Sequence, residues 1–145
     1  MQNFTLKQSE AADALQRHLG LPEESEYLWR AVIAFEGYPF QTAGRGKNHT
    51  GAISFQYTVS RSTGASGRHY TGISIPGYGN EIWISTPDGE KKEKSISRST
   101  VELALKNALE EQLKSDCVSG PRKLGVPGVR SNLYAMFLRF GVITQ

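Results

Sequence analysis

The chain has 145 residues, of which 38% are hydrophobic and 21% charged, and its formal net charge is +3. These values favour one ordered domain over residues 1–145 and not a disordered chain. No apolar run in the chain approaches the roughly 20 residues that cross a bilayer, which excludes a membrane-spanning helix.

The cysteine content and the start of the chain indicate the compartment. The single cysteine, Cys117, excludes an intramolecular disulfide framework and a cysteine-rich zinc site. The first residues show no secretory signal pattern. We therefore expect a cytoplasmic protein without a membrane partner.

Two helices are predicted at the start of the chain, over residues 1–37. Thr5 and Gln8 have the spacing of a capping box, and the helix that they open runs to Leu19 with apolar residues at every fourth position. A second helix follows Pro22, with acidic residues in its first turn, where the helix dipole favours them. Its apolar stripe comprises Leu28, Ala31, Val32 and Phe35. This region is therefore predicted to be a helical pair.

A small antiparallel sheet is predicted over residues 38–90. Nine of the fifteen glycines fall between Gly37 and Gly79, where alternation of apolar and polar residues replaces the helical period. The alternation predicts three strands, at residues 53–59, 70–75 and 81–86. Long glycine-rich loops are expected at 44–51 and 61–68.

Two further helices are predicted over residues 95–145. Ser99 and Glu102 have capping-box spacing at the head of a helix that runs to Leu113. A last helix, from Leu133 to Phe140, ends at Gly141. The resulting order, α-α-β-β-β-α-α, indicates an α+β fold whose two C-terminal helices pack on the central sheet.

Charge is unevenly distributed along the chain. Residues 1–43 contain three Lys or Arg against six Asp or Glu, so the positive excess lies in the remainder. Two stretches, Gly37–Asn80 and Cys117–Gln145, contain no Asp or Glu. A surface that faces phosphate must avoid carboxylates as well as supply cations, so both stretches are candidates for an anion-binding face. A mildly basic, solvated surface is the alternative.

The C-terminal stretch resembles the helix-turn-helix of the Fis-type DNA-binding proteins. Leu124-Gly125-Val126 matches the turn after the first helix, Asn132-Leu133 the opening of the second, and Phe140-Gly141-Val142 its end. Phe137 occupies the later packing position. The resemblance covers about the last sixth of the chain. It implies that the start of the second helix meets base edges or phosphate. A plain helical hairpin that completes the core is the alternative.

The favoured hypothesis is a small, non-enzymatic nucleic-acid-binding protein of the kind that a phage or mobile element carries. We expect DNA rather than RNA, and a homodimer if the target is palindromic, because one helix of this size gives little specificity. The expected contact residues are Arg122, Lys123, Arg130, Ser131, Asn132, Tyr134 and Arg139.

The glycine-rich loops support a second hypothesis. Their glycines allow close backbone approach and their cations attract anions, so they suit a phosphate cradle or the contact surface of an inhibitor or sponge for a protein or nucleotide. Ordinary hairpin loops have the same composition. The candidate loop residues are Arg45, Lys47, His49, Arg61, Arg68 and His69. Four aromatic residues are candidates for base stacking or for core packing, namely Tyr57, Tyr70, Tyr78 and Trp83.

No catalytic set is evident. His69-Tyr70-Thr71 fits the His-x-Thr element of the two-histidine phosphoesterases, but its partner His49-Thr50 lacks the spacer residue. No Cys–His pair, carboxylate pair or metal-ligand spacing is present. We therefore expect neither a cofactor nor a bound metal.

Overall fold

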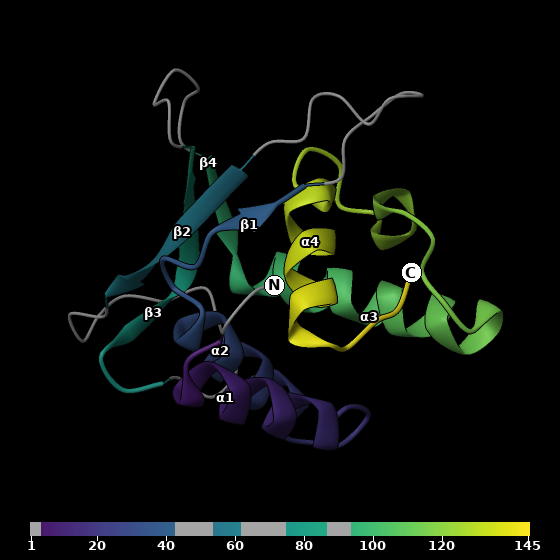
Figure 1. The fold of residues 1–145 in the computed structure, drawn as a ribbon, viewed down its shortest axis with the longest axis horizontal. Helices are drawn as coiled ribbons and strands as arrows, with labels where there is room; N and C mark the ends of the chain where they lie inside the picture. Colours follow the sequence, from purple (N-terminus) through teal and green to yellow (C-terminus); the bar gives the residue numbers. More distant parts are fainter. Residues whose placement is uncertain (1–3, 43–53, 62–74, 87–93) are drawn as a thin grey trace.

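The computed structural model describes residues 4–42, 54–61, 75–86 and 94–145. Its helices are α1 (Leu6–Arg17), α2 (Glu24–Ala34), α3 (Arg98–Ser115), the 3-10 helix η1 (Pro121–Leu124) and α4 (Arg130–Phe140). Its strands are β1 (Phe40–Gln41), β2 (Ser54–Arg61), β3 (Tyr78–Ser85) and β4 (Lys94–Ser97). The predicted α+β class is confirmed, with a helical pair at the N-terminus and two α-helices at the C-terminus (Figure 1).

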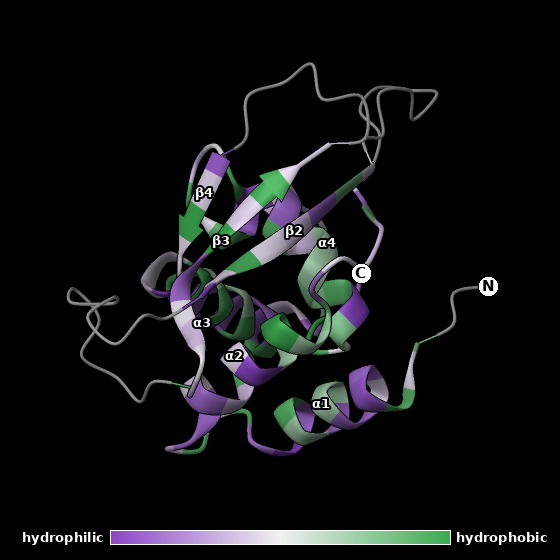
Figure 2. Ribbon diagram, turned by 90° about the vertical axis from the view of Figure 1, so that its left-hand side faces the viewer, coloured by the Kyte–Doolittle hydropathy of each residue, from purple (hydrophilic) through white to green (hydrophobic). Residues whose placement is uncertain are grey.

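The four strands form one antiparallel sheet in the order β1-β2-β3-β4. Along β2, Phe55 and Tyr57 are buried whereas Gln56 and Thr58 are exposed, which is the alternation of a sheet covered on one face. The helices pack on the face that carries the buried side chains (Figure 1). In Figure 2 the strands lie in front of α3 and α4, so the viewer sees the other face of the sheet.

The N-terminal helical pair is anchored at its start and against the sheet. The predicted capping box is present, because Gln8 N–H donates to Thr5 Oγ1 at 3.1 Å and Thr5 N–H donates to Gln8 Oε1 at 3.0 Å. On α2, the buried Trp29 indole donates to the backbone carbonyl of Gly79 on β3 at 2.9 Å. This bond satisfies a polar group inside the core and ties α2 to the sheet.

Helix α4 lies inside the core rather than on its surface. Seven of its eleven residues are buried. The Phe140 ring packs against Phe35 at a centroid distance of 4.9 Å and against Phe40 of β1 at 6.4 Å. The helix ends at Gly141, as predicted, in a left-handed conformation with φ of 75°.

The observed strands match the predicted ones only where apolar and polar residues alternate over a long stretch. The strands predicted at 53–59 and 81–86 are confirmed as β2 and β3, with shifted ends. β1 and β4 are not predicted from the sequence, because two and four residues are too few to show alternation. The strand predicted at 70–75 lies outside the described residues except for Ile75, which precedes β3.

The capping box predicted at Ser99 is wrong. The N-cap of α3 is Ser97, whose hydroxyl accepts the Thr100 N–H at 3.2 Å. Glu102 forms an ion pair with Arg98, one turn earlier on the same helix. A serine does cap this helix, but it is Ser97, two residues before the predicted Ser99.

Candidate anion-binding surface

The segment from η1 to the first residue of α4, residues 121–130, carries three of the cations predicted to bind nucleic acid. Its position is fixed against α3, because the Asn107 amide donates to the Leu124 carbonyl at 2.9 Å and the Leu124 side chain is fully buried. Gly125 and Gly128 have positive φ values of 80° and 92°, which allow the chain to turn sharply into α4. Residues 121–130 therefore present their side chains from an anchored backbone.

Four cations lie on or against residues 121–130, and we name them the cationic turn: Lys94, Arg122, Lys123 and Arg130. Lys94 joins from β4, because its Nζ donates to the Gly128 carbonyl at 2.9 Å. Arg122 and Lys123 are exposed, and the Lys123 ammonium lies 3.8 Å from the Glu111 carboxylate. Within the described residues, neither Arg122 nor Arg130 forms an ion pair. Positive charge therefore remains available for an anion.

The first turn of α4 adds the positive end of a helix to these cations. Arg130 and Ser131 are partly exposed there, and the turn holds no acidic residue. Val129, the residue before the helix, provides no side-chain cap. The first intrahelical bond runs from Leu133 N–H to Val129 O at 3.1 Å, so the three preceding N–H groups point out of the helix end. Such an end favours anions.

Of the other predicted contact residues, two are mostly buried and one lies at the far end of α4. Asn132 is 6% exposed and Tyr134 is 3% exposed. The Tyr134 hydroxyl donates to the buried Val118 carbonyl at 2.6 Å, so this side chain belongs to the core and cannot reach a base. Arg139 is exposed but lies at the other end of α4, about 14 Å from Arg130 along the helix axis.

The helix-turn-helix interpretation does not fit this geometry. In place of a first α-helix the chain forms η1, which has four residues. A recognition helix must project from the surface to enter a major groove, whereas most of α4 is buried. Leu124, Leu133 and Phe137, which support the resemblance, are all core residues. The alternative interpretation, a hairpin that completes the core, is the one that agrees with the structure.

Among the predicted loop cations, Arg61 is described and is already engaged. Its guanidinium lies 2.9 Å from the Glu36 carboxylate and its Cζ lies 4.6 Å from the centre of the Tyr78 ring. The hydrogen bond from Arg61 lowers the pKa of Glu36 from its usual value, although partial burial acts in the opposite direction. The remaining loop candidates lie outside the described residues: Arg45, Lys47, His49, Arg68 and His69.

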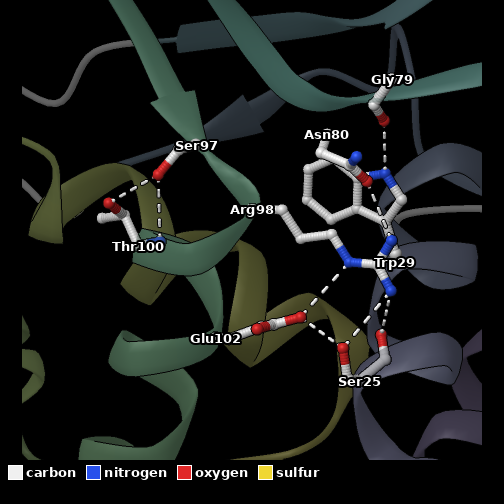
Figure 3. Close-up of polar contacts among 8 residues, drawn as sticks. All are labelled: Ser25, Trp29, Gly79, Asn80, Ser97, Arg98, Thr100 and Glu102. Atoms are coloured by element: carbon white, nitrogen blue, oxygen red, sulfur yellow. Dashed lines mark hydrogen bonds and ion pairs between the residues drawn. The ribbon is translucent and has the colours of Figure 1, made fainter. Parts of the chain in front are cut away.

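Arg98 is a buried arginine that the sequence does not single out. It is fully buried at the first position of α3 and joins three elements (Figure 3). Its guanidinium donates to Glu102 at 3.3 Å and to Asn80 on β3 at 3.0 Å. It also donates to the carbonyl and hydroxyl of Ser25 on α2 at 3.3 Å, and its Cζ lies 5.4 Å from the Trp29 ring. These protein acceptors occupy the guanidinium, so Arg98 has a structural role.

The uncovered face of the sheet presents an exposed tryptophan. Trp83 is 41% exposed, whereas Trp29 is buried. The strand register places Thr58 and Ser95 on either side of Trp83. A flat aromatic ring between hydroxyl groups is suited to stacking on a base. Of the other stacking candidates on these strands, Tyr57 is fully buried and belongs to the core, and Tyr78 is partly buried with the Arg61 guanidinium over its ring.

Two negative findings apply to the part of the chain that the structure describes. No three His, Cys, Asp or Glu side chains gather there as a metal site, and none of its helices combines the length and apolar character needed to cross a membrane. Comparison with known proteins gives no match, whether to a family model, to a curated protein or to a solved structure.

Proposed function

We propose that this protein binds nucleic acid by its phosphate backbone through the cationic turn. The observation that carries this proposal is that cations from β4, η1 and α4 lie on or against one short segment, residues 121–130, which ends at a helix N-terminus. Lys94 lies far from the other three in the sequence, and its bond to the Gly128 carbonyl brings it to them. The cluster is therefore a product of the fold rather than of a locally basic sequence.

The absence of carboxylates in the C-terminal stretch supports a polyanionic ligand. Residues 117–145 contain no Asp or Glu, so the segment that supplies η1 and α4 brings cations without competing acids. Glu111, on α3, is the acidic neighbour of Lys123. Phosphate contacts position a protein on nucleic acid without reading its sequence. Because Asn132 and Tyr134 are buried, the proposal assigns no base reading to them.

Fluorescence anisotropy with a labelled duplex and a labelled single strand, each at about 50 and 200 mM salt, tests this proposal. We expect binding that weakens steeply with salt. Arg122→Ala with Arg130→Ala should lower the affinity and reduce the slope of log K against log salt by about 2, because two phosphate contacts are lost.

A matched control separates a local site from net charge. Lys7→Ala with Arg17→Ala removes the same charge from exposed positions of α1. The proposal requires that this pair bind almost as tightly as the wild type. Equal losses in the two double variants, or no binding at the lower salt, would contradict a specific role for the cationic turn.

The exposed Trp83 favours a single strand over a duplex. Because Trp29 is buried, quenching of the intrinsic fluorescence by an added strand reports mainly on Trp83. Base stacking on an aromatic ring contributes roughly 1–3 kcal/mol per base. We expect Trp83→Ala to weaken single-strand binding and to leave duplex binding unchanged. If Trp83→Ala leaves the affinity for both ligands unchanged, the sheet face that carries Trp83 is not part of the interface.

A further inference from the structure

We infer that the N-terminus of α4 is a phosphate-binding subsite within the cationic turn. Its donors are the backbone N–H groups of residues 130–132, the Arg130 guanidinium, the Ser131 hydroxyl and the Asn132 amide. The inference rests on the proposed function only for the source of the phosphate, a nucleic-acid backbone. The phosphate group of a monoester or of inorganic phosphate offers the same oxygen acceptors.

The Asn132 side chain is the observation that distinguishes this helix end. It is 6% exposed, and its amide forms no hydrogen bond with another residue that the structure describes. An amide in a mostly buried side chain without a protein partner loses part of its hydration and gains no hydrogen bond in return. As the third residue of α4, Asn132 belongs to the first turn of the helix, and its Cα–Cβ bond tilts toward the helix N-terminus. A ligand there would satisfy the amide.

The Asn132 amide is also open to a ligand. Across the described ranges, Tyr38 Oη is the one side-chain polar atom that is both completely enclosed and unpaired. The amide of Asn132 therefore keeps an opening to solvent while the rest of its side chain is packed. It lies in the same turn as the partly exposed Arg130 and Ser131.

The donor set selects an oxyanion. Backbone N–H groups and a guanidinium donate hydrogen bonds and accept none, while the serine hydroxyl and the asparagine amide can each donate as well. Lys94 Nζ adds a positive charge at the Gly128 carbonyl, two residues before the helix. Phosphate presents several acceptor oxygens and negative charge in one group, which matches these donors.

The other α-helix starts in the described part of the chain are already satisfied. α1 is closed by the reciprocal Thr5 and Gln8 bonds, and α3 is capped by Ser97. α2 has Glu24 and Glu26 in its first turn, which complement the helix dipole. At α4 the protein supplies neither a side-chain cap nor a carboxylate.

Titration of the ¹⁵N-labelled full chain with inorganic phosphate, against chloride at matched ionic strength, tests the subsite. We expect saturable shifts of the backbone amides of residues 130–132 and none for residues 98–100 of α3. Ser131→Asp should weaken phosphate binding by about tenfold, because a carboxylate then occupies the helix end.

Ser99→Asp is the matched control. Ser99 and Ser131 are both the second residue of a helix whose first turn contains no acid. Both aspartates suit a helix N-terminus, so neither should lower the thermal midpoint. Only Ser131→Asp should lose phosphate affinity. Equal affinities in the two variants overturn the subsite.

Asn132→Leu provides a second, independent test of the phosphate subsite. It removes the amide while keeping a similar volume, and it should reduce phosphate affinity without changing the contacts of Arg122 and Lys123. Wild-type phosphate binding in Asn132→Leu, or phosphate shifts that spread evenly over surface lysines, overturn the subsite.

The source of the phosphate is resolved with oligonucleotides that carry or lack a 5′-phosphate. A preference for the phosphorylated strand supports a terminal monoester at the subsite, and equal binding that Ser131→Asp weakens supports a backbone diester. Nucleic-acid binding that persists without phosphate shifts overturns the subsite alone. Saturable phosphate shifts without nucleic-acid binding support the subsite and overturn the proposed function.

Discussion

Helices α3 and α4 begin with the same dipeptide, Arg-Ser, in opposite surroundings. Arg98 at α3 is fully buried and donates to side chains and a carbonyl from three elements (Figure 3). Arg130 at α4 is partly exposed and forms no ion pair with the described residues. The first helix start is closed by the protein, and the second is left open.

The residue before each helix explains part of this difference. Ser97 has an extended backbone, with ψ of 153°, which turns its hydroxyl toward the Thr100 N–H. Val129 has ψ of 0° and an apolar side chain, so neither its conformation nor its chemistry can cap α4. Equal dipeptides therefore do not give equal sites, because the preceding backbone and the burial of the arginine decide what the helix end can bind.

The largest expected effect separates the two arginines. Arg98→Ala should lower the free energy of unfolding by about 3 kcal/mol, because it leaves buried partners such as Asn80 without a hydrogen bond and opens a cavity. Arg130→Ala should lower it by less than about 0.5 kcal/mol. Urea unfolding of both variants measures the contrast.

Arg98→Met refines the comparison, since it keeps most of the side-chain volume and removes the donors. We expect its unfolding free energy to lie between those of the wild type and Arg98→Ala. If Arg98→Ala and Arg130→Ala cost the same, the two helix starts do not differ in the way described.

Local signals in the sequence predicted the helix ends that depend on neighbouring residues. The Thr5 and Gln8 pair gave the start of α1, and Gly141 gave the end of α4. In each case the interacting atoms lie within four residues of one another, so spacing alone is informative. The same logic failed at Ser99, because two serines close together offer two registers and the sequence does not choose between them.

Contacts between distant residues could not be predicted from the spacing of neighbouring residues in the sequence. The bond from Lys94 to the Gly128 carbonyl joins residues 34 positions apart and has no local signal. The burial of Tyr134 did have a local signal, because residues 133–138 are all apolar or aromatic and so cover every side of the helix, which is typical of a core helix. Leu133 and Phe137, which support the resemblance to a DNA-binding motif, belong to this apolar run, so the resemblance does not distinguish an exposed helix from a core helix.

A smaller effect is expected from the cap itself. Ser97→Ala should lower the free energy of unfolding by about 1 kcal/mol, because the Thr100 N–H loses its acceptor. Ser95→Ala is the control, since Ser95 is exposed on the same strand and caps no helix. Equal costs for the two serines, measured by thermal or urea unfolding, would show that the α3 cap contributes nothing.

The smallest expected effect is the reverse change at α4. Val129→Thr keeps the shape of the side chain and adds the hydroxyl of a common cap residue. At ψ of 0° that hydroxyl does not face the first-turn N–H groups, so we expect a stability change below about 0.5 kcal/mol. A gain close to 1 kcal/mol would mean that the backbone rotates to accept a cap. The α4 start would then be held open only by the valine, and phosphate affinity should fall in the same variant, since the new hydroxyl would compete for the N–H groups that the ligand needs.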